Sequence, residues 1–346
     1  EMSSRGLGDV YKRQFLMGPM QGTSVTDNAW QHGVIYKTGV FAEYHFSKKG
    51  WKIIASGRLE NNVANAKEIT EEFVEIYTDT KTSEINPSFS IGTVKKLNKG
   101  ISIGLWLGRT QRSGSLTERY INYFAVGQDS YELLGNPNIK QEINNQSDVT
   151  FQFKKGKTSL NIDGFVSFLQ NAISSSIDTS LTPNIPSSPG VRRYENIDKA
   201  FKTGAELIWR QEWVPGLNHE VSLAYTYGQD LSRNEPLPEI APLDMRFSLY
   251  GDFFTSYFLP ELNLRHVIKQ KRVSSEYGET TSPNFTLLDI SIASRISQVF
   301  SVSVGVKNIL GTTYYEHLNR SVSGSDGLPI YEPGRSFLVS LNLNFL

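Results

Sequence analysis

Five side chains that could contact a substrate lie together in one short stretch of the chain. The stretch runs from Gly108 to Tyr120 and reads GRTQRSGSLTERY; the candidates in it are Arg109, Arg112, Glu118, Arg119 and Tyr120. Guanidinium groups donate paired hydrogen bonds to anionic oxygens, and an aromatic ring offers a face to a planar or cationic group. The stretch is therefore a candidate substrate-binding segment.

The same side chains could instead hold the chain in shape. Charged pairs are commonly structural, and these side chains could hold the barrel wall and the loop in shape through salt bridges. The sequence favours this structural interpretation and leaves the ligand-binding interpretation open.

Metal-binding side chains are few and scattered. The chain has no cysteine, and its histidines stand far apart, at His32, His45, His219, His266 and His317. Met17 and Met20, together with His32, carry soft donor atoms that would suit copper. They lie in a stretch without strand pattern, so we predict no metal site and no cofactor.

Other classes of chemistry have no signature in the chain. It contains no Gly-rich phosphate loop, no nucleophile elbow and no zinc-protease motif. Its formal net charge is +0, so no nucleic-acid partner is expected. We therefore expect that the protein is not an enzyme.

The elements that must position these residues are β-strands. In the last stretch, Pro333–Leu346, apolar side chains alternate with serine and asparagine, the apolar ones being Phe337, Val339, Leu341, Leu343 and Phe345. Such alternation predicts a strand with one apolar and one polar face. The same pattern recurs about thirteen times along the chain. Short turns of about four residues alternate with connections of about ten to over thirty residues.

This alternation of connections is typical of membrane barrels. No run of about eighteen apolar residues predicts a transmembrane helix, whereas strands of about ten to fourteen residues suit a tilted crossing. The predicted fold is all-β: an up-and-down antiparallel transmembrane β-barrel with short periplasmic turns and long extracellular loops. Because the strand number is odd, we expect a partial barrel in which the last strand is an open edge. A soluble β protein would instead need a second sheet to bury the apolar face.

Domain organisation follows the strand pattern. Residues 1–14 have no periodicity and resemble a translated cloning scar. Residues 15–36 are rich in glycine and polar side chains and are predicted to be loop or disordered. Residues 37–346 carry the strands.

Several motifs in residues 37–346 resemble those of the TonB-dependent outer-membrane receptors. The resemblance lies in the stretch from Gly108 to Tyr120 and in four others, which are Lys37-Thr-Gly-Val-Phe-Ala-Glu-Tyr44, Gly135-Asn-Pro-Asn-Ile-Lys-Gln-Glu142, Val306-Lys-Asn-Ile-Leu-Gly-Thr-Thr-Tyr-Tyr-Glu-His-Leu318 and Glu332-Pro-Gly-Arg335. Gly114 and Gln141 stand where the family usually has proline, and Leu346 follows the aromatic on which the family commonly ends. Glu316 and His317 match a family segment and are expected to be architectural.

The resemblance implies a function and a set of partners. Receptors of this family have a coupling box, a plug domain and a 22-stranded barrel, and they take up scarce nutrients, typically ferric siderophores. The chain is expected to be the C-terminal part of the barrel, without plug or box, and not competent in transport alone. Implied partners are outer-membrane lipid, the TonB-ExbB-ExbD energy-coupling complex acting through the plug, the barrel-assembly machinery acting on the terminal strand, and an anionic metal chelate. The implied location is the outer membrane of a Gram-negative bacterium.

Alternatives remain within and beyond the family. The substrate could be copper, another metal or cobalamin, and the protein could instead be a passive outer-membrane channel or an adhesin barrel. In any of these barrels, polar side chains of the inner face should contact the plug or lumen water, and we assign Glu43, His45, Lys52, Arg58, Glu206 and Arg210 to that face.

Overall fold

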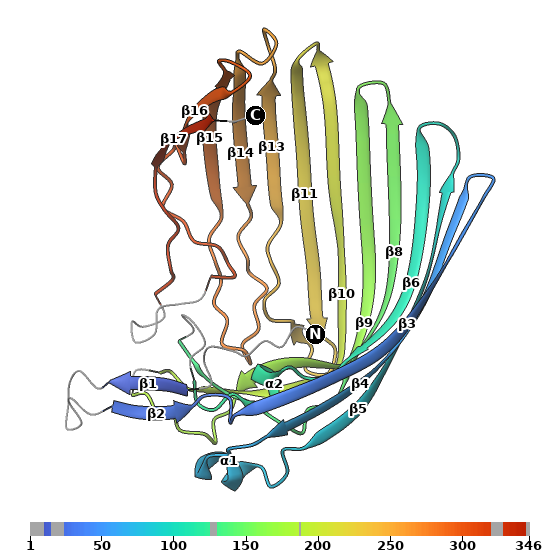
Figure 1. The fold of residues 1–346 in the computed structure, drawn as a ribbon. Helices are drawn as coiled ribbons and strands as arrows, with labels where there is room; N and C mark the ends of the chain where they lie inside the picture. Colours follow the sequence, from blue (N-terminus) through green and yellow to red (C-terminus); the bar gives the residue numbers. More distant parts are fainter. Residues whose placement is uncertain (1–9, 15–23, 125–129, 187, 320–327, 344–346) are drawn as a thin grey trace.

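One curved antiparallel sheet makes up most of the molecule (Figure 1). The computed structural model describes residues 10–14, 24–124, 130–186, 188–319 and 328–343. Within these residues the sheet has fifteen strands, of which the short β7 (Glu132–Leu134) and β12 (Glu235–Pro236) lie off the main path. The other strands each pair with their neighbour in the chain. They are β3 (Gly33–Lys48), β4 (Trp51–Ala66), β5 (Thr82–Lys96), β6 (Ile101–Arg112), β8 (Glu142–Lys155), β9 (Thr158–Ile177), β10 (Val191–Val214), β11 (Leu217–Asp230), β13 (Asp244–Gly251), β14 (Leu259–Val267), β15 (Phe285–Arg295), β16 (Phe300–Lys307) and β17 (Ser336–Leu343).

The sheet does not close into a barrel. In the described residues, β3 pairs only with β4 and β17 pairs only with β16, so these two strands form the edges. Without β7 and β12, thirteen strands remain on the main path of the sheet, which is the number that the sequence predicts. The predicted all-β, up-and-down, partial barrel with an open terminal strand is therefore confirmed.

Short and long connections gather at opposite ends of the sheet (Figure 1). The turn between β3 and β4 needs only Lys49 and Gly50, both at positive φ, as a two-residue hairpin requires. The long connections carry two short helices, α1 (Glu71–Ile76) and α2 (Leu116–Tyr120). No helix among the described residues is long and apolar enough to span a membrane.

Several strands are longer than the sequence pattern predicts. The longest, β10, has 24 residues and would extend about 80 Å at 3.3 Å per residue, well beyond a bilayer core. Its loop-end half lacks clean alternation because both faces there are covered or polar, so the period-two signal disappears although pairing with β9 continues. This strand is therefore longer than the ten to fourteen residues that the pattern predicts.

The N-terminal prediction also needs correction. Residues 15–36 were predicted to be loop, but Ser24–Asn28 form β2, which pairs with β1 (Val10–Gln14), and β3 already begins at Gly33. Backbone pairing supplies these strands where side-chain alternation does not. Met17 and Met20 lie outside the described residues. The assignment of residues 1–14 as a scar stays a prediction.

The two faces of the wall differ as predicted. On β11 one face carries apolar and aromatic side chains, whereas the other carries Asn218, Glu220, Ser222 and Thr226. Many apolar side chains of the first face are exposed, Val40, Leu105, Tyr225 and Leu341 among them. An exposed apolar belt on a strand wall is the arrangement that faces lipid in membrane barrels.

The buried core lies at the loop end and not in the wall. Its largest cluster joins Ala64 and Ala66 of β4 to the two helices and to the segments after them, through Phe73, Tyr77, Tyr120, Tyr123, Leu134 and Val191. Two smaller clusters lie beneath the later loops, around Ile240 and around Phe285. The long connections are thus packed structures that can hold side chains in fixed positions.

Candidate functional site: the mouth formed by the long loops

The first candidate region is the junction of β6 and α2, which we call the α2 corner (Arg112 to Tyr120 with its contacts). Ser115 caps α2 by accepting a hydrogen bond from the Glu118 backbone N–H at 3.3 Å, while the Ser115 N–H donates to Glu118 Oε2 at 2.6 Å. This reciprocal pair is a capping box. It fixes the Glu118 carboxylate beside the end of β6.

Arg112 binds two carboxylates at the corner. Its Nη1 donates to both oxygens of Glu118 at 3.0 Å, and its Nε donates to Glu142 Oε1 at 2.9 Å. Arg112 thus joins β6, α2 and the first residue of β8. The hydrogen-bond donors of the Arg112 guanidinium are therefore occupied by partners within the protein.

Arg119 is wholly buried, with 0% exposure. Its guanidinium donates to Glu84 Oε2 at 2.5 Å, to the Pro137 carbonyl at 2.7 Å and to the Gly114 carbonyl at 3.3 Å. These bonds bring the two motifs around residues 108–120 and 135–142 into contact. They form although Gly114 stands where proline is usual.

Tyr120 is buried beside Arg119. Its hydroxyl donates to the Thr80 carbonyl at 2.7 Å, and burial raises the pKa of Tyr120 to about 12. The structure therefore brings Arg112, Glu118, Arg119 and Tyr120 together. Arg109 lies further down β6, where it donates to Asn145 Oδ1 at 2.8 Å. Contact of these five residues with a substrate stays a prediction.

A second region at the same end is a cavity between loops, which we call the loop cavity. Its volume is about 230 Å³, and its lining comes from six separate parts of the chain, namely Ser130-Tyr131, Arg192, Glu239, Tyr277 to Thr280 with Ser282, Tyr315 with His317 to Asn319, and Pro329. Arg192 lies between two rings, with its guanidinium carbon 4.0 Å from the Tyr277 centroid and 4.9 Å from the Tyr131 centroid. The lining thus combines stacked aromatic rings with charges of both signs.

Glu279 and His317 supply the titratable groups of the loop cavity. Glu279 accepts hydrogen bonds from the backbone N–H groups of Glu239 at 2.5 Å and Ser274 at 2.9 Å, and burial raises the pKa of its carboxyl. His317 Nε2 lies 3.8 Å from Glu279 Oε1, and burial lowers the pKa of the imidazole. Neither ring nitrogen of His317 has a hydrogen-bond partner among the described residues. Both groups therefore keep hydrogen-bonding capacity.

The loop cavity could not be predicted from the sequence. Its lining residues are spread over some two hundred positions, and loop segments carry no periodic pattern that would bring them together. His317 was expected to be architectural. Its neighbour Glu316 does bind Arg265 Nη2 at 3.1 Å, but His317 lines the loop cavity instead.

Metal-binding side chains do not cluster in the described part of the chain. No group of three or more histidine and carboxylate side chains could hold an ion there. His45 contacts Glu43, and His32 lies 3.9 Å from Glu68. The polar pairs Arg58–Glu60 and Arg210–Glu220, at 2.6 and 2.5 Å, lie along strands of the wall.

Comparison with known proteins assigns the family. Residues 5–309 match the profile of the TonB dependent receptor-like β-barrel. The chain belongs to this family. No curated protein sequence matches the TonB-dependent receptor chain described here.

Solved structures of similar fold agree with the family assignment. The copper transporter OprC aligns with a TM-score of 0.79 and 21% identity, over 93% of this chain and 50% of its own. The FrpB iron transporter from Neisseria meningitidis (F3-3 variant) aligns at 0.63 and 17%, over 90% and 45%. The ferric yersiniabactin uptake receptor FyuA from Yersinia pestis aligns at 0.66 and 11%, over 91% and 46%. This TonB-dependent receptor chain thus spans about half the length of the structures that it matches.

Proposed function

We propose that the chain forms part of the wall and the extracellular mouth of an outer-membrane receptor of a Gram-negative bacterium, which takes up a metal chelate. The proposed substrate is a ferric siderophore or another iron complex. Energy for uptake would come from the TonB-ExbB-ExbD complex, and the barrel-assembly machinery would recognise the terminal strand. The protein would act by binding and transport, without enzymatic chemistry.

This proposal rests on the loop cavity, which lies at the loop end of a β-sheet that belongs to this family. A siderophore complex presents anionic oxygens and planar groups to the protein. Arg192 lies between Tyr131 and Tyr277 in the cavity lining, where its charge, although only 2% of the residue is exposed, would favour an anionic ligand. FyuA and FrpB, which share this fold, are named for ferric yersiniabactin and for iron.

The test is growth under iron limitation. A receptor-null strain carrying the complete gene should grow on one or a few ferric siderophores from a panel, and growth should stop when the energy-coupling complex is deleted. Growth that persists without that complex would instead indicate a passive channel. No growth on any chelate would contradict the proposal.

Copper is the second candidate. OprC, which aligns at a TM-score of 0.79, is a copper transporter, and the loop cavity holds an imidazole, a ligand that suits copper. The same strain should then accumulate copper, and ferric chelates should not support growth. No group of three or more metal-binding side chains gathers in the described part of the chain, which favours a chelate over a bare ion.

A further inference from the structure

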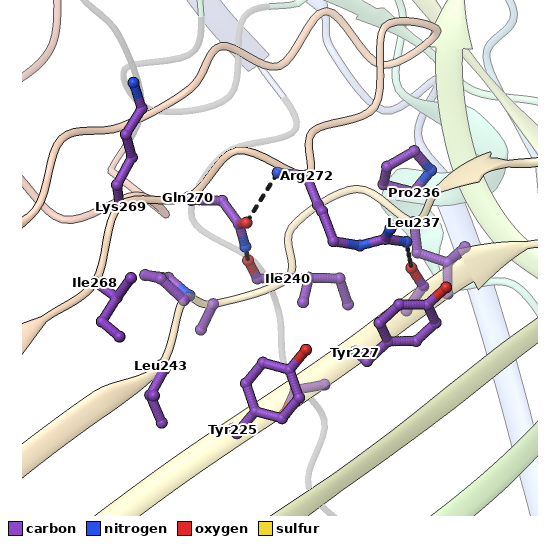
Figure 2. A pocket seen from close by; sticks show the side chains of 14 residues that line it. Tyr225, Tyr227, Pro236, Leu237, Ile240, Leu243, Ile268, Lys269, Gln270 and Arg272 are labelled. Carbon is purple, nitrogen blue, oxygen red and sulfur yellow. Dashed lines mark hydrogen bonds between the residues drawn. The ribbon is translucent and has the colours of Figure 1, made fainter.

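A different cavity opens in the wall near the loop end of β11 (Figure 2). Its volume is about 190 Å³. Tyr225 and Tyr227 of β11 line it, with Leu243 and Ile268 from the neighbouring strand ends. Lys269 stands on one side of it and Arg272 on the other (Figure 2). We call it the wall cavity.

The aromatic lining of the wall cavity belongs to the apolar face. Side chains two residues apart on a strand point the same way, so Tyr225 shares its face with Leu223. Leu223 pairs with Met245, and Leu243, two residues before Met245, continues the same face. This face is opposite to the one that carries Glu220. The tyrosine side of the wall cavity therefore lies on the apolar face of the wall, and Leu237 and Ile240 of the connection between β11 and β13 line its other side.

Its height along the wall can be estimated from the strand. Tyr227 lies ten residues beyond Leu217, where β11 leaves its short turn. Ten residues rise about 33 Å along a strand, which spans about 25 Å of bilayer at a tilt of about 40°. The apolar band of such barrels is about 25 Å tall. In the orientation that the proposed function requires, the wall cavity lies at the outer-leaflet interface.

Arg272 places a cation at this height. Its guanidinium carbon lies 4.2 Å from the Tyr227 ring centroid, and its Nη2 donates to Gln229 Oε1 at 2.6 Å. Among the described residues, its Nε and Nη1 groups have no hydrogen-bond acceptor. No carboxylate there lies within salt-bridge distance of Lys269 or Arg272, and both side chains are exposed. The charge is thus fixed in position but not neutralised.

We propose that the wall cavity binds an anionic, phosphate-bearing lipid of the outer leaflet. One acyl chain enters between Tyr225, Leu243 and Ile268, where it replaces water on half-exposed apolar surface. The phosphate oxygens accept hydrogen bonds from Arg272, whose fork suits them, and the Lys269 ammonium adds a second positive charge. This inference rests on the outer-membrane location in the proposed function, but not on the transported substrate.

The experiment measures lipid binding to the purified full chain in detergent micelles by native mass spectrometry. The probes are diphosphoryl lipid A, the same lipid without phosphates, and phosphatidylethanolamine. We expect the diphosphoryl form to bind about tenfold more tightly than the dephosphorylated form, as one charge-assisted pair predicts. Arg272→Gln should remove that preference, and Arg272→Lys should keep part of it.

Lys95→Gln is the matched control. Lys95 also lies over an aromatic ring, 4.6 Å from the Trp51 centroid, but at the short-turn end of the wall. Its removal should leave lipid A binding unchanged. Equal binding of phosphorylated and dephosphorylated lipid to the unaltered chain would overturn the proposal, as would an equal loss in Lys95→Gln. No metal chelate is present, so neither outcome bears on the uptake experiment.

Discussion

The α2 corner and the loop cavity lie at the same end of the sheet and use the same residue types, yet they differ in how their polar groups are satisfied. In the corner, Arg119 makes three hydrogen bonds inside the protein and Arg112 binds two carboxylates. In the cavity, both ring nitrogens of His317 lack a hydrogen-bond partner among the described residues. Saturated groups hold a fold together, whereas groups with remaining capacity can bind a ligand. We therefore interpret the corner as architectural and propose the cavity as the site of recognition.

The largest expected effect is the loss of Arg119. Arg119→Met leaves the Glu84 carboxylate without its partner in a buried site, so the free energy of unfolding should fall by about 3–5 kcal/mol. Urea unfolding in micelles measures it. The double variant Arg119→Met with Glu84→Gln should recover much of the loss, and Arg109→Gln is the control on the same strand. A stable Arg119→Met chain whose gene no longer supports uptake would reverse the assignment of the corner.

A smaller effect is expected at Tyr120. Tyr120→Phe removes the donor to the Thr80 carbonyl and leaves a buried acceptor unpaired, which should lower the free energy of unfolding by about 1–3 kcal/mol. The same urea titration measures it. Chelate uptake by the complete receptor should keep its affinity, since the ring remains in place. A change in affinity without a change in stability would make Tyr120 a ligand contact.

In the loop cavity we expect a substitution to change ligand affinity more than it changes stability. Tyr277→Leu removes the ring 4.0 Å from Arg192, and we expect the apparent affinity for the ferric chelate to fall by about three- to thirtyfold, as a cation–π contact of about 0.5–2 kcal/mol predicts. Competition with a labelled chelate measures it. Tyr257→Leu, an exposed tyrosine at the short-turn end, is the control. An unchanged affinity would remove the cavity from the binding site.

The smallest effect concerns pH. Burial lowers the pKa of His317 in the folded chain. Below about pH 6.5 the imidazole therefore binds more protons in the unfolded chain than in the folded one. The stability contributed by this group falls as pH falls through that value. The raised pKa of Glu279 acts in the opposite direction, since its contribution falls as pH rises above about 4.5. Arg192 and Glu239 face the same cavity.

His317→Gln separates the two groups. Amide hydrogen exchange of residues 308–319 should accelerate between pH 7.5 and 5.5 in the unaltered chain, after correction for intrinsic exchange rates, and by less in the variant. The variant keeps Glu279, Glu239 and Arg192, so the difference reports the imidazole alone. Equal profiles would show that His317 is not buried in the folded loop.

Much of the fold could be predicted from the sequence. Period-two alternation located thirteen strands because one face of each carries apolar side chains and the other polar ones, and the terminal stretch with Phe337 and Leu341 became an edge strand as expected. Strand length was underestimated where this contrast is lost, as in the loop-end half of β10. The short β2 was missed because only backbone pairing with β1 defines it.

The candidate sites also differ in how far the sequence predicts them. Residues 108–120 were found because their partners lie nearby in the chain or in a second recognisable motif, but the sequence could not decide whether Arg119 faces a ligand or the core. The tertiary structure decided this question, because only the folded loops bring Glu84 and Pro137 to the Arg119 guanidinium. Neither the loop cavity nor the wall cavity could be predicted from the sequence, for a stronger reason. Their lining comes from segments joined only by the curvature of the sheet and the packing of its loops, and no local pattern of side chains records a contact between residues as distant as Tyr131 and His317.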